Sequence, residues 1–126
     1  MVRTWRELGV WQKAHKLVLQ IYELVAAFPS KEKYRLVDQL CRSAISVPAN
    51  IAEGHGRHTT KEYIQFLYNA RGSLEETRYH LLLARDLGYL TLEAYEKAES
   101  GAEEISRMLN GLIQSLRSTS AGGLSE

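Results

Sequence analysis

The sequence has few of the residues that build disulfide-bonded, extended or membrane-spanning proteins. A single cysteine, Cys41, excludes an intrachain disulfide. No apolar run approaches the ~20 residues that cross a bilayer, and the N-terminus lacks the apolar stretch of a secretory signal. Only two prolines occur in 126 residues, and no segment alternates β-branched with polar residues. These absences predict a cytoplasmic, helical protein with no membrane association.

The charge is small overall but unevenly placed. A net charge of +1 does not indicate a general nucleic-acid binder. Residues 1–63 hold ten Lys or Arg against six Asp or Glu, giving +4, whereas residues 64–126 hold six against nine, giving −3. This asymmetry fits a basic face, attraction between subunits, or an ordinary mixed surface, and the sequence leaves all three open.

Apolar residues recur at spacings of three and four along the chain, which predicts four amphipathic helices. We expect them at about 8–28, 31–53, 60–87 and 92–116. Their short connections predict an all-α, antiparallel, up-down-up-down four-helix bundle formed by residues 1–116. The Ser/Gly-rich residues 117–126 are predicted to be a disordered C-terminal tail.

Several residues predict local features of these helices. Pro48 lies inside the second helix and predicts a kink, because proline lacks an N–H and crowds the preceding turn. Gly54 is expected to end that helix in a left-handed conformation. Thr59 and Thr91 are expected to cap the third and fourth helices. Gly72, in the middle of the third helix, is expected to let another helix approach closely.

Some of these helices are apolar over more than one face. The runs 17–19 and 81–83 are wholly apolar, and each covers a wider arc than one monomeric core needs. This predicts a homo-oligomer whose interface includes large apolar side chains, namely those of Trp5, Trp11, Tyr22, Tyr79 and Leu82. The alternative is that the aliphatic stems of charged neighbours cover the extra leucines.

A line of polar residues crosses the second helix and the loop after it. Asn50 and Glu53 either satisfy backbone groups freed by the proline, brace Arg57, or line a ligand site. We favour the two architectural roles, which predict that replacing Asn50 or Glu53 by alanine lowers thermal stability. The complete motif comprises Arg42, Ser46, Pro48, Asn50, Glu53, Gly54 and Gly56.

Signals for catalysis or metal binding are weak. Glu53, His55 and His58 lack the fuller ligand set that zinc needs. Cys41 lies on an apolar stripe, and no serine has a base placed near it by a motif. Gly54 and Gly56 do not form a phosphate loop. We therefore expect no enzymatic activity, no metal, no cofactor and no small-molecule substrate.

The stretch from Gln39 to Gly54, followed by Gly56 and Arg57, carries a family resemblance. Its letters, QLCRSAISVPANIAEG, closely resemble the signature of the bacterial four-helix-bundle proteins named 23S rRNA intervening-sequence proteins. The similarity spans about residues 7–116. Cys41 departs from the family pattern, which has an arginine or another polar residue there, and this argues against a role for charge at that position.

The resemblance implies a non-enzymatic bundle that assembles as a ring-like homopentamer. Members are encoded within insertions in ribosomal RNA genes. A related branch, the accessory proteins of diversity-generating retroelements, binds nucleic acid and a reverse transcriptase through basic surfaces. The resemblance therefore implies a scaffold for RNA or another nucleic acid, and the alternative is a module that docks a partner protein without nucleic acid. The candidate nucleic-acid contacts are Arg57, His58, Lys61 and Arg71, with Lys13, Lys16, Lys31, Lys33 and Arg35 in reserve.

Overall fold

The computed structural model describes the backbone of residues 2–125 and the side chains of residues 2–119. Within that range the chain contains four α-helices, two short 3-10 helices and no strand, which confirms the predicted all-α fold. The elements are η1 (Trp5–Glu7), α1 (Gly9–Val25), η2 (Ser30–Glu32), α2 (Leu36–His55), α3 (Thr60–Asp86) and α4 (Leu92–Ser125). None of the described helices is both long and apolar enough to cross a membrane.

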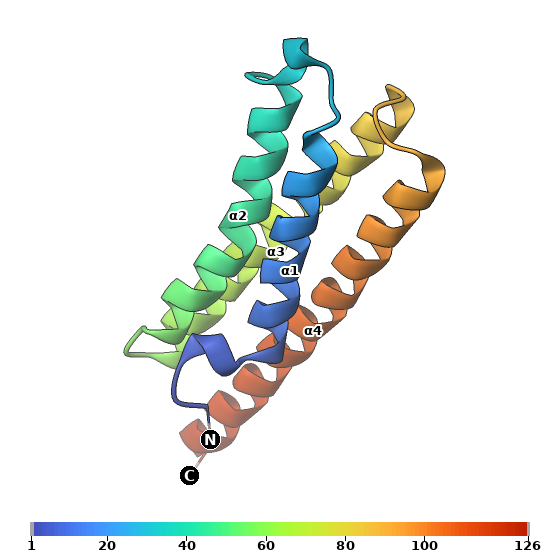
Figure 1. Cartoon of the computed structure of the whole chain (residues 1–126). Helices are drawn as coiled ribbons and strands as arrows, with labels where there is room; N and C mark the ends of the chain where they lie inside the picture. The colour runs from blue at the N-terminus through green and yellow to red at the C-terminus, as the bar shows by residue number, and fades with distance from the viewer. Residues whose placement is uncertain (1, 126) are drawn as a thin grey trace.

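The four helices pack side by side as a four-sided bundle. α2 packs against α1 and α3, and α4 packs against α3 and α1. In Figure 1 the chain reverses direction at each connection. The α2–α3 loop, residues 56–59, lies at the same end as the start of α1 and the last turns of α4 (Figure 1), and we call this the α2–α3 end.

Leucine and isoleucine side chains from all four helices fill the centre of the bundle. Burying each one stabilises the fold by roughly 1.5–3 kcal/mol relative to an exposed side chain. The largest side chains that are fully or almost fully buried are Ile21, Leu40, Ile51, Leu67, Leu74, Leu81, Ile105 and Leu109. The apolar residues that recur at spacings of three and four in the predicted helices include four that instead lie on the surface, namely Tyr34, Ile45, Leu87 and Leu92.

α2 begins at Leu36, five residues later than the sequence predicted, and the buried carboxylate of Glu32 holds the turn before it. Glu32 Oε2 accepts a hydrogen bond from the Tyr89 hydroxyl at 2.7 Å, and Oε1 accepts one from the backbone N–H of Leu36 at 3.4 Å. The hydrogen bond from Tyr89 stabilises the charged form and lowers the pKa of Glu32. This polar contact ties η2 to the α3–α4 turn.

The predicted caps of α3 and α4 are confirmed. Thr59 Oγ1 accepts from the backbone N–H of Glu62 at 3.1 Å, and Thr91 Oγ1 accepts from that of Ala94 at 3.1 Å. Gly88, with φ +81°, ends α3 in the left-handed conformation that glycine adopts most readily.

α4 extends to Ser125, past residue 116, where the sequence predicted the bundle to end. Adding turns to an existing helix needs no new nucleation, so even a Ser/Gly-rich segment can continue one. Arg117, in this extension, donates to the Tyr68 hydroxyl at 2.9 Å. The predicted tail 117–126 lies partly outside the described residues, since nothing is described of the side chains of residues 120–125 or of residue 126.

The predicted role of Gly54 is wrong. α2 continues past it to His55, and Gly54 does not have a positive φ. Gly54 is buried instead where α2 meets α3. A Cβ at this position would lie 2.6 Å from Phe66 Cβ and 3.1 Å from Tyr63 Cδ1. Glycine is required here because the two helices approach too closely for any side chain.

The predicted role of Gly72 is also wrong. Gly72 is exposed on α3, and an added Cβ would meet no atom within 4 Å. No helix within the described part of this chain therefore uses this position for close approach.

The two glycines form a matched pair for measurement. Gly54→Ala forces a methyl group against Phe66, so we expect a loss of about 1–3 kcal/mol of stability. In a chain of this size, that loss lowers Tm by about 4–12 °C. Gly72→Ala should raise stability by up to ~1 kcal/mol, because alanine is the better helix former. Thermal melts showing equal effects for the two variants would contradict the close approach of α2 and α3.

Candidate functional site

The polar motif of α2 is partly an internal hydrogen-bond network. Asn50 Nδ2 donates to the carbonyl oxygen of Ser46 at 2.8 Å and to its hydroxyl at 2.9 Å. Asn50 therefore does not bond the carbonyl of Ala44, the group that Pro48 leaves without its helical donor. Pro48 is buried within α2, and the kink expected there stays a prediction.

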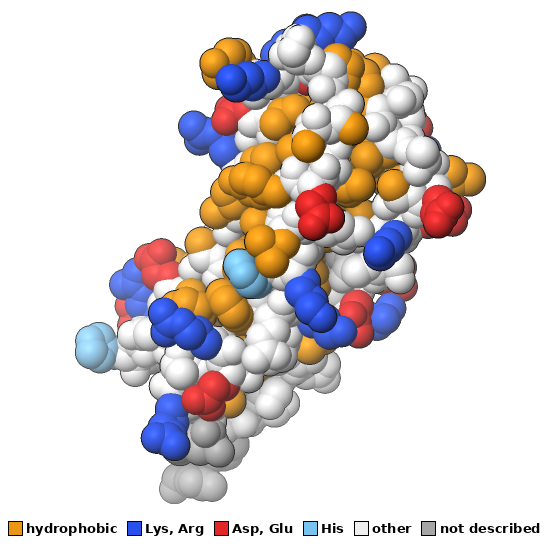
Figure 2. Space-filling view, viewed as in Figure 1, with side chains coloured by type: hydrophobic (Ala, Val, Ile, Leu, Met, Phe, Trp, Pro, Cys, Tyr) orange, Lys and Arg blue, Asp and Glu red, His pale blue; other side chains and the backbone are white. Residues whose placement is uncertain are grey.

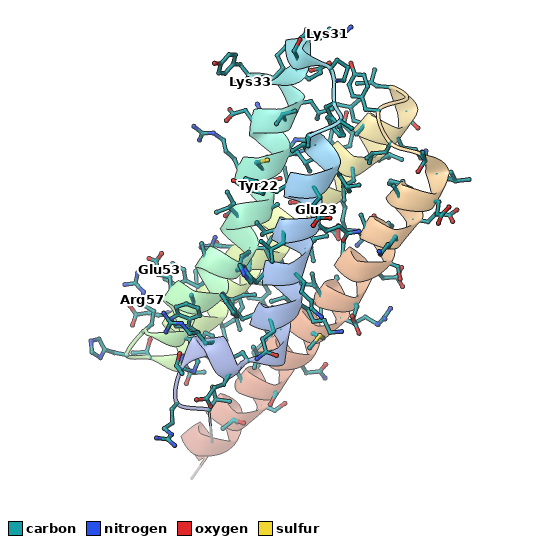
Figure 3. All side chains as sticks on the ribbon, viewed as in Figure 1. Tyr22, Glu23, Lys31, Lys33, Glu53 and Arg57 are labelled. Carbon is teal, nitrogen blue, oxygen red and sulfur yellow. The ribbon has the colours of Figure 1, made fainter. Side chains whose placement is uncertain are left out.

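Glu53 and Arg57 form an ion pair at the C-terminal end of α2, as one of the two architectural interpretations expected. Arg57 Nη2 lies 2.5 Å from Glu53 Oε2, and its guanidinium stacks on Phe66 at 4.5 Å from the ring centroid. Figure 3 shows the two side chains together at the α2–α3 end. Glu53 thus offsets much of the charge that Arg57 would offer to a nucleic acid. Arg42 is similarly paired, with Asp38 at 3.3 Å.

Hydroxyl groups join α2 to α3 within the apolar interface. The Ser73 hydroxyl donates to Ser46 Oγ at 2.8 Å, and the Thr77 hydroxyl donates to Ser43 Oγ at 2.9 Å. We call these four residues the hydroxyl ladder. Among the described side chains, no buried polar atom lacks a hydrogen-bond partner. The sequence offered a signal for the ladder, since Ser43 and Thr77 occupy core-facing positions in otherwise apolar helix stripes.

His80 extends the hydroxyl ladder towards the surface of α3. Its Nδ1 lies 3.3 Å from Ser43 Oγ, and its Nε2 lies 3.9 Å from Glu76 Oε2. Serine, histidine and a carboxylate can form a nucleophilic site, but this serine is buried and also donates to the carbonyl of Leu40 at 3.1 Å. The arrangement therefore favours a structural role.

The environment of His80 makes stability depend on pH. Desolvation lowers the pKa of His80 below its ordinary value of 6.5, more than Glu76 raises it. The unfolded chain therefore binds a proton more readily than the folded protein does. We expect the contribution from His80 to be complete above about pH 6.5 and to diminish as the pH falls below that value.

Melts between pH 7.5 and 5 measure this effect. The wild-type Tm should fall as the pH drops below 6.5, and His80→Gln should flatten that dependence. His58→Gln serves as the control, because His58 is exposed. An unchanged pH dependence in His80→Gln would show that another group is responsible.

The four candidate nucleic-acid residues do not form one cluster. His58 and Lys61 are exposed at the α2–α3 end, beside the paired Arg57. Arg71 lies further along α3, in a groove against α4, and donates to Asn110 Oδ1 at 2.9 Å. Two of the reserve residues, Lys31 and Lys33, lie at the opposite end of the bundle (Figure 3), and a third, Lys13, pairs with Glu104.

Large apolar side chains are exposed on the surface formed by α1 and α2. Leu19, Tyr22 and Ile45 are 52%, 51% and 43% exposed, and we call them the apolar surface. Figure 2 shows hydrophobic side chains gathered over these two helices. Of the other predicted interface residues, Tyr79 is exposed and Leu82 is half-buried. Trp5 and Trp11 pack on each other, with ring centroids 4.8 Å apart, so part of their area is already covered.

No group of three or more His, Cys, Asp or Glu side chains suited to holding a metal ion occurs among the described residues. Burial raises the pKa of the Cys41 thiol, which keeps it from the reactive thiolate form.

The comparisons with known proteins decide the family. The family model described as "23S rRNA-intervening sequence protein" matches residues 6–111. The chain belongs to this family. A crystal structure of a protein of unknown function from the S23 ribosomal protein family of Bacteroides thetaiotaomicron is similar, with a TM-score of 0.75 and 27% identity. That similarity covers 82% of this chain and 97% of the other. No curated protein matches the sequence significantly.

Proposed function

We propose that this 23S rRNA-intervening sequence protein is a non-catalytic, self-associating scaffold that binds structured RNA. The observation that carries the proposal is a surplus of positive charge towards the α2–α3 end. Residues 53–71 and 105–119 together hold five Lys or Arg against two Glu, a surplus of three positive charges in a chain whose net charge is +1. Phosphate contacts supply much of the affinity of proteins for RNA, so a local surplus matters more than the total charge.

Self-association would multiply this surplus. The apolar surface has large side chains exposed together on adjacent helices, which is unusual for a monomeric protein. Covering this surface with another copy of the chain would remove its apolar area from water. The homopentamer implied by the sequence resemblance would repeat each basic residue five times. Several weak phosphate contacts, linked rigidly in one assembly, bind far more tightly than one of them alone.

The absence of catalysis is part of the same proposal. The candidate nucleophile Cys41 has a raised pKa, and Ser43 is buried within the hydroxyl ladder. Both are occupied in packing or hydrogen bonding between helices, which supports an architectural role for them.

RNA binding by the purified protein, titrated with salt, tests the proposal. We expect the logarithm of the binding constant to fall linearly with the logarithm of salt concentration, by ~0.7–0.9 for each phosphate contact. Lys61→Glu should weaken binding, because it places a negative charge at the basic end. Lys97→Glu, the same change at another exposed lysine on the first part of α4, is the control. Absence of binding at low salt would rule out the RNA scaffold.

Light scattering tests self-association separately. The wild-type protein should scatter as a multiple of the 14.3 kDa chain, and Tyr22→Glu should shift it towards the monomer because a charge would be buried in the interface. Tyr34→Glu is the control, since Tyr34 is 83% exposed and lies outside the apolar surface, on the short segment between η2 and α2. A wild-type monomer at high concentration would contradict the proposal.

Docking of a protein partner is a second candidate function, favoured by a different surface. A groove of about 510 Å³ lies between α2 and α3, away from the α2–α3 end. Three exposed apolar side chains line it, those of Tyr34, Tyr79 and Leu87. Binding of one stoichiometric protein partner that resists salt, without RNA binding, would favour this function.

A further inference from the structure

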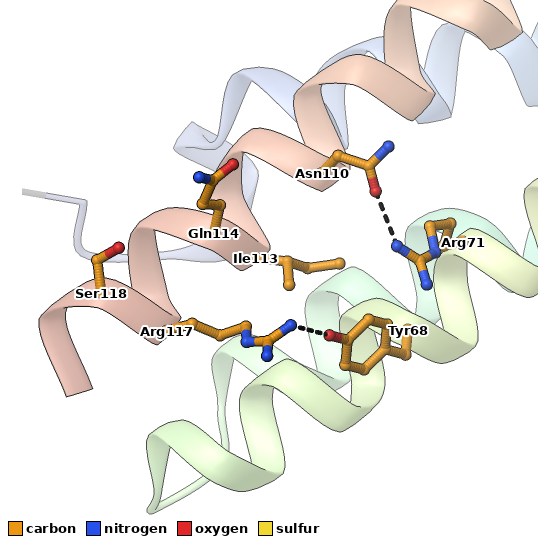
Figure 4. Close-up of a pocket in the computed structure, with 7 residues that line it drawn as sticks. All are labelled: Tyr68, Arg71, Asn110, Ile113, Gln114, Arg117 and Ser118. Atoms are coloured by element: carbon orange, nitrogen blue, oxygen red, sulfur yellow. Dashed lines mark hydrogen bonds between the residues drawn. The ribbon is translucent and has the colours of Figure 1, made fainter. Parts of the chain in front are cut away.

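A second groove, between α3 and α4, carries two arginines and no carboxylate. Its volume is about 510 Å³. Its lining residues are Tyr68, Arg71, Asn110, Ile113, Gln114, Arg117 and Ser118 (Figure 4). All of them except Ile113 have polar side-chain atoms, and the buried Ile113 forms an apolar floor.

The two guanidinium groups are held by neutral acceptors. Arg71 Nη1 donates to Asn110 Oδ1 at 2.9 Å, and Arg117 Nη1 donates to the Tyr68 hydroxyl at 2.9 Å. The Arg71 guanidinium also stacks on the Tyr68 ring, 4.7 Å from its centroid. Figure 4 shows Arg71 reaching from α3 to Asn110 on α4, and Arg117 reaching from α4 to Tyr68 on α3.

Six other arginines among the described side chains differ in having a carboxylate partner within 4.0 Å. They are Arg35, Arg42, Arg57, Arg78, Arg85 and Arg107. Among the described side chains, no carboxylate oxygen lies within 4.0 Å of the guanidinium nitrogens of Arg71 or Arg117, and the same holds for those of Arg3 and Arg6 near the N-terminus. The walls of the groove have no acid either, since residues 63–74 of α3 and 105–119 of α4 contain no Asp or Glu. The groove therefore holds two positive charges and no carboxylate among the residues that line it.

This chemistry suits a phosphate group. A guanidinium has five N–H donors in a planar fork, and the recorded hydrogen bonds use one nitrogen of each arginine. The remaining donors can bind phosphate oxygens through charge-assisted hydrogen bonds. Because Asn110 and Tyr68 already orient the two side chains, less side-chain freedom would be lost on binding.

The groove also lies where an assembly would leave it open. α1 and α2 form one side of the four-sided bundle, and α3 and α4 form the opposite side. Self-association through the apolar surface of α1 and α2 would therefore leave the α3–α4 groove facing away from that contact.

We propose that the α3–α4 groove is a phosphate-binding site in which Arg71 and Arg117 hold the phosphate oxygens of a bound ligand. The phosphate belongs either to the backbone of an RNA or to a free nucleotide, and the RNA form of this inference rests on the proposed function. Arg117 was not among the residues that the sequence suggested, because it was assigned to the tail.

Replacing both arginines tests the site. Arg71→Gln combined with Arg117→Gln removes two charges and keeps polar side chains. The matched control, Arg42→Gln combined with Arg85→Gln, removes the same charge from arginines that are paired with Asp38 and Asp86 and lie outside the basic end. Melts establish that both double variants fold.

RNA titration with salt is the first readout. Losing two phosphate contacts should make the slope of log binding constant against log salt less steep by about 1.4–1.8, whereas the control should keep the wild-type slope. RNA binding with an unchanged slope in Arg71→Gln/Arg117→Gln would overturn the groove site and leave the proposed function standing.

A nucleoside monophosphate, followed by NMR of the arginine Nε–H groups, is the second readout. If RNA does not bind but the nucleotide shifts the Arg71 and Arg117 signals, the site takes a free nucleotide, and only the proposed RNA function fails. If neither ligand binds, both proposals are overturned.

Discussion

The close approach of α2 to α3 is the constraint on which the rest of the bundle depends. Gly54 leaves no room for a Cβ against Phe66 and Tyr63, and the hydroxyl ladder crosses the same interface further along. The glycine contact sets the distance between the helices, and the ladder sets their register, because each hydroxyl has its partner at only one alignment. Hydrogen bonds of this kind add little net stability but are costly to leave unmade once buried. A slip between α2 and α3 would therefore break several of them together.

This helix pair also determines what the surface presents. The loop after Gly54 places Arg57 beside Glu53, so the arginine that follows the family-like stretch is paired with a carboxylate. The register of α3 then directs Tyr68 and Arg71 towards α4, where Asn110 and Arg117 meet them. The result is a division between the apolar surface on α1 and α2 and two guanidinium groups, each bonded to a neutral acceptor, between α3 and α4. A scaffold that assembles through one side and binds a ligand through the other needs such a division.

The sequence predicted the helices better than their faces. Helical periodicity, Thr59 and Thr91 were sufficient to place four helices and two of their starts. Periodicity could not show that Ile45 and Leu92 lie on the surface of the bundle. An apolar residue at the edge of a stripe has the same spacing whether its side chain packs into the core or faces the solvent. The roles of Gly54 and Gly72 were likewise beyond the sequence, since the space around a glycine depends on a neighbouring helix. Only one of the two arginines of the basic groove was predicted from the sequence. Arg71 was a candidate, but Arg117 reaches the groove only because α4 continues through a segment whose composition suggests a tail.

Hydrogen–deuterium exchange of the protein alone and with a structured RNA tests the central claim most directly, because it maps the bound surface without altering any residue. The RNA scaffold with a phosphate site between α3 and α4 predicts slower exchange in residues 56–72 and 107–119 when RNA is present. The apolar surface on α1 and α2 should show no such change when RNA is added, because self-association already covers it in the free protein. Protection confined to α1 and α2, or no protection at RNA concentrations that saturate binding, would contradict the account.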